Sequence, residues 1–135
     1  MNPSPAGIGS RRGSAPAEEG PPPLPDCVFC DIAGGHAPAV ILRSWNDAIA
    51  IRPLNPVARD HFLVLPRRHV ADASTDPDVT AATMRRAAEL LTTGSHIGAN
   101  VGAEAGQTVF HLHIHIWGCR APRTCMPWEH NDHPV

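Results

Sequence analysis

Short apolar runs in the middle of the chain predict β-strands. Three of them stop at prolines or polar residues: Val40–Leu42, Ala48–Ile51 before Pro53, and Phe62–Leu65 before Pro66. Proline has no backbone N–H to donate to a neighbouring strand, so it marks where such a run ends. We therefore predict three short strands between positions 40 and 66.

A helical period replaces this pattern after position 74. Apolar side chains recur there at helical spacing, at Met84, Ala87, Ala88, Leu90 and Leu91. Ser74 or Thr75 is a suitable N-cap, Pro77 is favoured in a first turn, and Gly94 ends the run. The spacing predicts one amphipathic helix between Ser74 and Gly94.

Two more strands are predicted towards the C-terminal end. Ile97–Val101 precedes a glycine-rich turn over residues 102–106, and Thr108–Trp117 then alternates in the manner of a strand. Several strands around one long helix are typical of the α+β class. We predict an α+β fold in which a five-stranded antiparallel sheet carries one main helix, with a short helical turn near Asp31.

The first 25 residues differ in composition from the rest of the chain. They hold seven of the 15 prolines and four of the 11 glycines, and Ile8 and Leu24 are their only large aliphatic residues. Such a segment buries too little apolar surface to offset the entropy lost on ordering. We predict a disordered tail over residues 1–25 and one folded domain over residues 26–135.

Charge and hydropathy exclude two classes of partner. The 135 residues carry 11 basic side chains, all of them arginine, and 13 acidic ones, for a net charge of −2. This balance gives no general attraction to nucleic acid or to an anionic membrane. No segment approaches the run of about 18 apolar residues that a membrane span needs, and the first residues lack a signal-peptide core. We expect a cytoplasmic protein with neither nucleic-acid nor membrane partners.

The segment Val109–Trp117 contains three histidines at alternating positions. In a strand His111, His113 and His115 share one face at intervals of about 7 Å, while the apolar residues between them pack on the other face. Imidazole acts as nucleophile, acid, base or metal ligand near neutral pH. The row is therefore either a catalytic metal site, as in zinc hydrolases, or a nucleophilic histidine with phosphate-binding neighbours. A dinuclear zinc hydrolase normally adds an aspartate just behind such histidines, and Ile116–Gly118 stands there instead.

A pair of cysteines near the start of the domain also carries chemistry. Cys27 and Cys30 are spaced so that both thiolates can bind one metal ion, which would need two further ligands. A redox dithiol or two buried thiols would show the same spacing. The pair alone leaves these three interpretations open.

Four blocks of the sequence occur in an order that is known from one family. They are Cys27–Ile32, Leu54–Val57, His61–His69, and Gly106–Trp117 with Asn100 before it. Together they resemble the histidine triad (HIT) superfamily of nucleotide hydrolases and transferases, in particular its phosphoramidase-like branch. The resemblance covers most of residues 27–117, and it implies the HIT fold and a homodimer.

The resemblance implies a reaction at the α-phosphate of a nucleoside 5′-monophosphate derivative. The middle histidine of the family's triad attacks phosphorus, which makes His113 the nucleophile and a covalent nucleotidyl-histidine the intermediate. His115 matches the histidine that binds the phosphate oxygens. Further substrate contacts are implied at the turn before the triad and near the C-terminal end, by Asn100, Gly106, Gln107, Thr108 and Trp128.

Relatives with the cysteine pair use it in a structural zinc site. Their other two ligands match His69 and His111, so the resemblance implies zinc bound by Cys27, Cys30, His69 and His111, and no organic cofactor. His111 then serves structure, while the other two triad members serve catalysis. The remaining histidines are expected to be structural, as for His61, or exposed.

One position departs from the family pattern. Members that bind a nucleoside usually place an Asp or Asn for the ribose hydroxyls shortly before the Leu54–Val57 block, where this chain has Pro53. A backbone carbonyl or Asn55 must replace that acceptor, or nucleoside preference is relaxed. Two alternatives to phosphoramidate hydrolysis stay open. Hydrolysis or phosphorolysis of dinucleoside polyphosphates would use the same His113, and a catalytically weak nucleotide-binding module would account for Pro53.

Overall fold

A computed structural model of the chain describes residues 26–54, 56 and 60–118. The predicted tail over residues 1–25 and the predicted substrate contact at Trp128 lie outside the described residues, as does Asn55.

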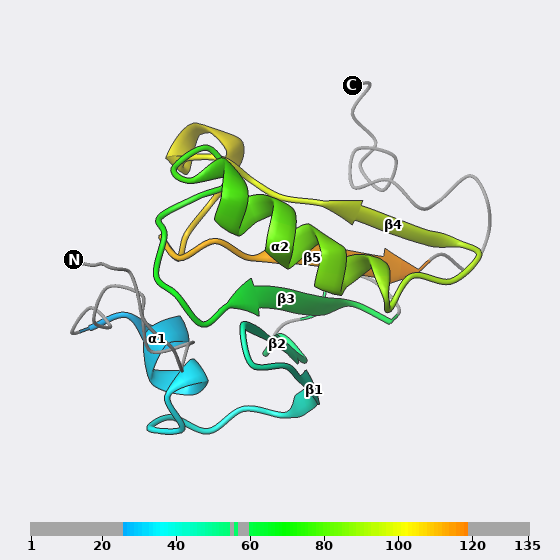
Figure 1. The fold of residues 1–135 in the computed structure, drawn as a ribbon. Coiled ribbons are helices and arrows are strands. Elements are labelled where there is room, and N and C mark those ends of the chain that lie inside the picture. Colours follow the sequence, from blue (N-terminus) through cyan, green and yellow to red (C-terminus); the bar gives the residue numbers. More distant parts are fainter. Residues whose placement is uncertain (1–25, 55, 57–59, 119–135) are drawn as a thin grey trace, which may run out of the picture.

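The strands form one antiparallel sheet (Figure 1). Along the chain they are β1 (Ile41–Ser44), β2 (Ala48–Ile51), β3 (Phe62–Pro66), β4 (Ser95–Gly98) and β5 (Ile114–Gly118). Their order across the sheet is β1-β2-β3-β5-β4, and each neighbouring pair is antiparallel. The helical elements are α1 (Val28–Ala33), α2 (Pro77–Ala88) and the 3-10 turn η2 (Ala103–Ala105). The predicted α+β fold, with its five strands, one main helix and short N-terminal helical turn, is confirmed.

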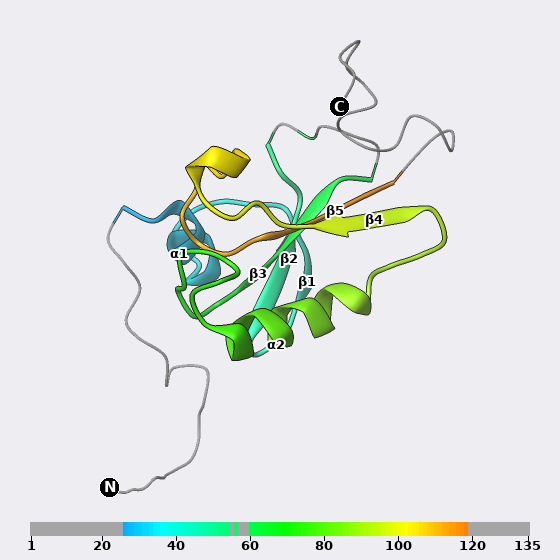
Figure 2. The same ribbon diagram turned by 90° about the horizontal axis from the view of Figure 1, so that it is seen from above.

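The two helices pack on opposite faces of the sheet (Figure 2). Because successive strand residues point to opposite faces, β3 sends Val64 towards α2 and Leu63 and Leu65 towards α1. The α2 side has a buried core of Ala50, Val64, Val70, Ala87, Leu112, Ile114 and Ile116. The α1 side has one of Phe29, Ile49, Ile51, Leu63 and Leu65. The sheet therefore separates two cores, and only the α1 side also receives the histidine row.

The cap of the main helix differs from the prediction. Asp76 is the N-cap, and its carboxylate accepts hydrogen bonds of 3.0 and 3.3 Å from two backbone N–H groups of the first turn. Ser74 and Thr75, the predicted caps, instead bond to the carboxylate of Asp72 in the preceding turn. The sequence offers several capping side chains in succession, and Asp72 engages the first two.

The helix also ends earlier than predicted, at Ala88 rather than close to Gly94. Leu91 therefore falls in the following loop and is 36% exposed, and Met84 on the helix is 39% exposed. β4 then begins at Ser95, two residues before the predicted strand. No helix within the described residues is long and apolar enough to cross a membrane.

β5 is shorter than the alternating pattern predicted. It begins at Ile114 rather than at Thr108. Its partner β3 ends at Pro66, which has no N–H for a ladder bond, so the chain before Ile114 runs beyond the paired part of β3. His111 and His113 therefore lie in the irregular segment that leads into β5, and Phe110 is 49% exposed instead of packing in a core.

Candidate active site and metal centre

Five histidines gather on the α1 side of the sheet. His61 precedes β3 directly, His69 follows β3, and the row of His111, His113 and His115 leads into β5. The ring centroids are 5.0 Å apart between His69 and His111, 5.1 Å between His113 and His115, and 5.3 Å between His61 and His115. The predicted row is thus part of a larger cluster, which the sheet assembles from distant segments.

His113 is held in one orientation by a backbone hydrogen bond. Its Nδ1 atom lies 2.8 Å from the carbonyl oxygen of His111. Because a carbonyl only accepts, Nδ1 carries the proton and Nε2 carries the lone pair in the neutral ring. Burial lowers the pKa of His113 from its ordinary value of 6.5, which favours the neutral ring at pH 7. The site thus holds an uncharged imidazole whose Nε2 lone pair is not used by the hydrogen bond to His111.

His111 has the opposite tautomer. Its Nε2 atom donates to the carbonyl oxygen of Pro66 at 2.8 Å, so its Nδ1 atom carries the lone pair. The side chain is fully buried, and this burial lowers its pKa to about 4. Metal-binding histidines commonly donate their second ring N–H to a carbonyl in this way. The lone pair of His111 is therefore on Nδ1, which suits a metal ligand, whereas that of His113 is on Nε2.

The four predicted metal ligands do meet. The Sγ atoms of Cys27 and Cys30 and the Nδ1 atoms of His69 and His111 all lie within 4.8 Å of one another. The two nitrogens are 3.2 Å apart, and sulfur–nitrogen distances are 3.3, 3.5 and 3.6 Å. Ordinary zinc bond lengths and tetrahedral angles place nitrogens about 3.3 Å apart and sulfur about 3.6 Å from nitrogen. The donor set and its spacing fit a tetrahedral zinc ion.

His115 is paired with His61, which was predicted to be structural. Nε2 of His61 lies 3.0 Å from Nδ1 of His115, and the rings stack at 19°. Burial and then the nearby His113 lower the pKa of His61, and the same causes, followed by His61, lower that of His115 to about 4. Both rings are therefore neutral at pH 7, and one donates its only N–H to the other.

The sequence did contain a signal for this pair. In the sheet Leu63 of β3 pairs with His115 of β5. His61 lies two positions before Leu63, and residues two apart share a face of a strand. His61 and His115 meet because of the register between β3 and β5, which the residue pattern of one segment does not give.

Gln107 shapes the turn before the triad. Its Oε1 atom accepts from the N–H of Gly102 at 2.8 Å, and its Nε2 atom donates to the carbonyls of Ala71 and Val109 at 2.8 and 3.0 Å. The side chain is only 4% exposed. A direct phosphate contact by the Gln107 amide would break one of these bonds, so we assign this side chain to the shape of the turn.

The other predicted contacts of the turn lie closer to solvent. Thr108 is exposed and makes no hydrogen bond within the described residues, which leaves its N–H and hydroxyl groups for a ligand. Gly106 has a φ of +92°, a conformation that L-residues rarely adopt. Asn100 donates from Nδ2 to the carbonyl of Ala105 at 2.6 Å and so binds to the same turn.

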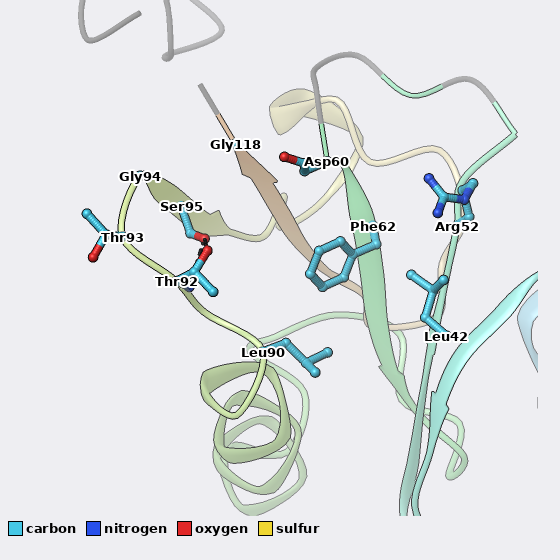
Figure 3. A pocket seen from close by; sticks show the side chains of 10 residues that line it. All are labelled: Leu42, Arg52, Asp60, Phe62, Leu90, Thr92, Thr93, Gly94, Ser95 and Gly118. Atoms are coloured by element: carbon cyan, nitrogen blue, oxygen red, sulfur yellow. Dashed lines mark hydrogen bonds between the residues drawn. The ribbon is translucent and has the colours of Figure 1, made fainter. Parts of the chain in front are cut away.

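Two hollows of similar size flank the sheet. One, of about 350 Å³, lies by the C-terminal end of α2, where Figure 3 shows Phe62 and Leu90 among the side chains that line it. None of the five clustered histidines lines this hollow. The other is a groove of about 360 Å³ that runs from two metal ligands to the turn, lined by Asp26, Cys27, Val28, His69, Thr108, Val109 and Phe110. The metal centre thus adjoins the groove, whereas His113 and His115 line neither of these two hollows.

Comparison with known proteins places this geometry in one family. Residues 35–121 match the HIT domain model. An uncharacterized HIT-like protein of Mycobacterium tuberculosis is 40% identical over 99 residues, which cover 67% of this chain and 69% of that protein. The adenylylsulfatase HINT3 of Arabidopsis thaliana is 34% identical over 75% of this chain and 55% of its own length.

Solved structures agree with the fold, and one of them is zinc-bound. A zinc-bound histidine triad family protein from Mycobacterium smegmatis superimposes with a TM-score of 0.66 at 32% identity, over 76% of this chain and 81% of that one. A HIT family hydrolase from Clostridium thermocellum gives a TM-score of 0.63 at 31% identity, over 73% and 96%.

Proposed function

Because the chain belongs to the histidine triad (HIT) family, we propose that it is a nucleotide hydrolase acting at the α-phosphate of nucleoside 5′-monophosphate derivatives, phosphoramidates first. The orientation of His113 is the observation that supports this most strongly. Its Nδ1–H is engaged by the carbonyl of His111, so the lone pair on Nε2 is the one available to attack phosphorus.

The reaction then proceeds in two displacements. In the first, Nε2 of His113 forms a bond to phosphorus, the bond from phosphorus to the amine breaks, and the amine leaves with one added proton. In the second, water attacks phosphorus, the bond to His113 breaks, and the nucleoside monophosphate is released. Nδ1 of His113 keeps its proton throughout, because the His111 carbonyl holds it.

His115 supplies a hydrogen bond in this scheme. When His61 donates to Nδ1 of His115, the single proton of His115 is on Nε2. That N–H can bond to a phosphate oxygen, while the proton that the departing amine gains comes from solvent, and the attacking water returns one proton to solvent in the second step. The pKa of His115, lowered to about 4, makes this ring a neutral donor and not a standing cation.

Zinc is the ion that we propose for the metal centre. Two thiolates and two imidazole nitrogens are its usual structural ligands, and the ligand distances fit it. Bound there, zinc ties the start of α1 to the segment before β5. Two cysteines that serve as thiolate ligands also suit a reducing compartment, which supports the predicted cytoplasmic location.

Two other substrates use the same site. Dinucleoside polyphosphates differ from phosphoramidates only in the group that leaves phosphorus when His113 attacks. The name of the Arabidopsis relative, an adenylylsulfatase, adds sulfate as a leaving group. Pro53, which is half-buried just after β2 and has no side-chain acceptor, favours the remaining alternative of a weakly catalytic nucleotide-binding module.

Release of AMP from adenosine 5′-phosphoramidate tests the proposed function. We expect the full chain to cleave this compound at least about tenfold faster than a diadenosine polyphosphate at equal concentration, which is the lower end of the discrimination that a binding pocket commonly gives. A reversed preference would assign the protein to the polyphosphate hydrolases. Binding of AMP without turnover of either compound would contradict the proposal and support the binding module.

A second copy of the chain is the partner that we propose. β4 lies at one edge of the sheet, and its outer side has no strand partner among the described residues. The opposite edge strand, β1, has a register irregularity between Ile41 and Arg43, which disfavours pairing there. A homodimer through β4 predicts twice the monomer mass in light scattering at micromolar concentration, and a monomer mass would contradict it.

A further inference from the structure

The nucleophile and the metal centre share parts of the structure. His111 binds in the metal centre through its side chain and holds His113 through its backbone carbonyl. Sheet pairing begins only at Ile114, so no ladder bond fixes this carbonyl. Within the described residues, the segment is held instead by the His111 ring and by the N–H of Leu112, which donates to Val70 at 2.7 Å.

A second connection runs through α1. Phe29 lies between the two cysteine ligands in sequence and is 8% exposed. The edge of its ring packs against His113, with centroids 5.1 Å apart, and against His111 at 5.9 Å. Cys27 Sγ accepts a hydrogen bond from the N–H of Cys30 at 3.3 Å, so the first turn of α1 is organised at the metal centre itself.

We propose that the metal centre positions His113 for attack, through the carbonyl of His111 and the ring of Phe29. This rests on the proposed function for its catalytic consequence, but the positioning itself is a property of the free protein. With the ion bound, both connections hold the His113 ring so that Nε2 points at the substrate. Without it, α1 and the segment before β5 lose their common anchor, and His113 exchanges between ring orientations.

Nuclear magnetic resonance of the full chain labelled with ¹⁵N in its histidines tests this without a substrate. In zinc-loaded protein we expect His113 to show one form, with a proton on Nδ1 and a bare Nε2. After removal of zinc with a chelator we expect a mixture of both tautomers. His96, which stacks on Trp117 at the other end of the sheet, serves as the internal control. An unchanged His113 signal in folded, metal-free protein would overturn the proposal.

A variant that keeps its zinc covers the case in which the metal-free chain unfolds. Phe29→Leu retains an apolar side chain but loses the ring edge against His113, and Phe62→Leu is the matched change on the α2 side. We expect Phe29→Leu alone to disturb the His113 signal and to slow nucleotidyl transfer to His113 about tenfold to a hundredfold, with zinc content unchanged. Equal behaviour of the two variants would overturn the proposal.

The positioning of His113 by the metal centre and the proposed hydrolase activity can be tested independently. If zinc removal or Phe29→Leu alters the His113 signal in a protein that cleaves no phosphoramidate, the positioning stands and the proposed function fails. If cleavage is normal and neither change affects His113, the function stands and the metal centre is only a structural cross-link.

Discussion

Alanine in place of His113 is expected to reduce AMP release from adenosine 5′-phosphoramidate by about a thousandfold or more, as for other enzymes that lose their nucleophile. The wild-type protein should also accumulate a covalent adenylyl adduct in rapid-quench experiments, and His113→Ala should not. The reason is that the Nε2 lone pair of His113 has no substitute whose ring is held in the same way within the described residues.

His96→Ala is the control for this experiment. His96 is a half-buried histidine of β4 next to β5, but it stacks on Trp117 and belongs to neither the metal centre nor the His61–His115 pair. We expect it to keep wild-type activity. An adduct that still forms in His113→Ala would show that another residue is the nucleophile.

The pH dependence of the wild-type rate provides an independent readout. Burial lowers the pKa of His113, and only the neutral ring attacks phosphorus. The rate is therefore expected to stay level from pH 8 to below 6.5, and then to fall about tenfold per pH unit below the lowered pKa. A rate that is already half lost at pH 6.5 would show that His113 titrates as an ordinary histidine.

Loss of one metal ligand is the second large effect. Cys30→Ala removes a buried thiolate, and we expect the protein to lose its zinc, about one ion per chain. A metal present at 1,000 times its dissociation constant stabilises a fold by about 4 kcal/mol. For a domain of this size that corresponds to a fall of about 15–30 °C in Tm, which calorimetry with metal analysis would measure.

A histidine outside the cluster gives the comparison. His96→Ala replaces a half-buried histidine that stacks on Trp117 and is not one of the four ligands, so its zinc content should equal that of the wild type. If Cys30→Ala keeps both its zinc and its Tm, the Cys2His2 site is wrong.

The local sequence pattern was sufficient to predict much of the fold and the four metal ligands. Alternation and prolines located β2 and β3 almost to the residue, since these strands lie in the middle of the sheet and are buried along most of their length. The cysteine spacing and the blocks resembling the family indicated four ligands that the structure brings within 4.8 Å.

The remaining features depend on contacts between distant segments. The pattern from Thr108 alternates well, but β5 starts only where β3 can pair with it, at Ile114. Gln107 was predicted as a substrate contact, and the structure adds a hydrogen bond from its amide to the carbonyl of Ala71, 36 positions away. The contact between His61 and His115 depends on the register between β3 and β5. In each case the side chain's role depends on which backbone group another segment presents to it.

The unequal chemistry of the two faces matters for engineering this chain. The buried cluster under α2 is aliphatic, with Trp45 and Phe62 packed against it, and such cores tolerate exchanges that preserve volume. The other face combines five histidines and two cysteines, each with a hydrogen-bonding or ligand role. Random libraries aimed at thermal stability should therefore be confined to the α2 side, because diversity introduced on the opposite face would mostly sample inactive or metal-free proteins.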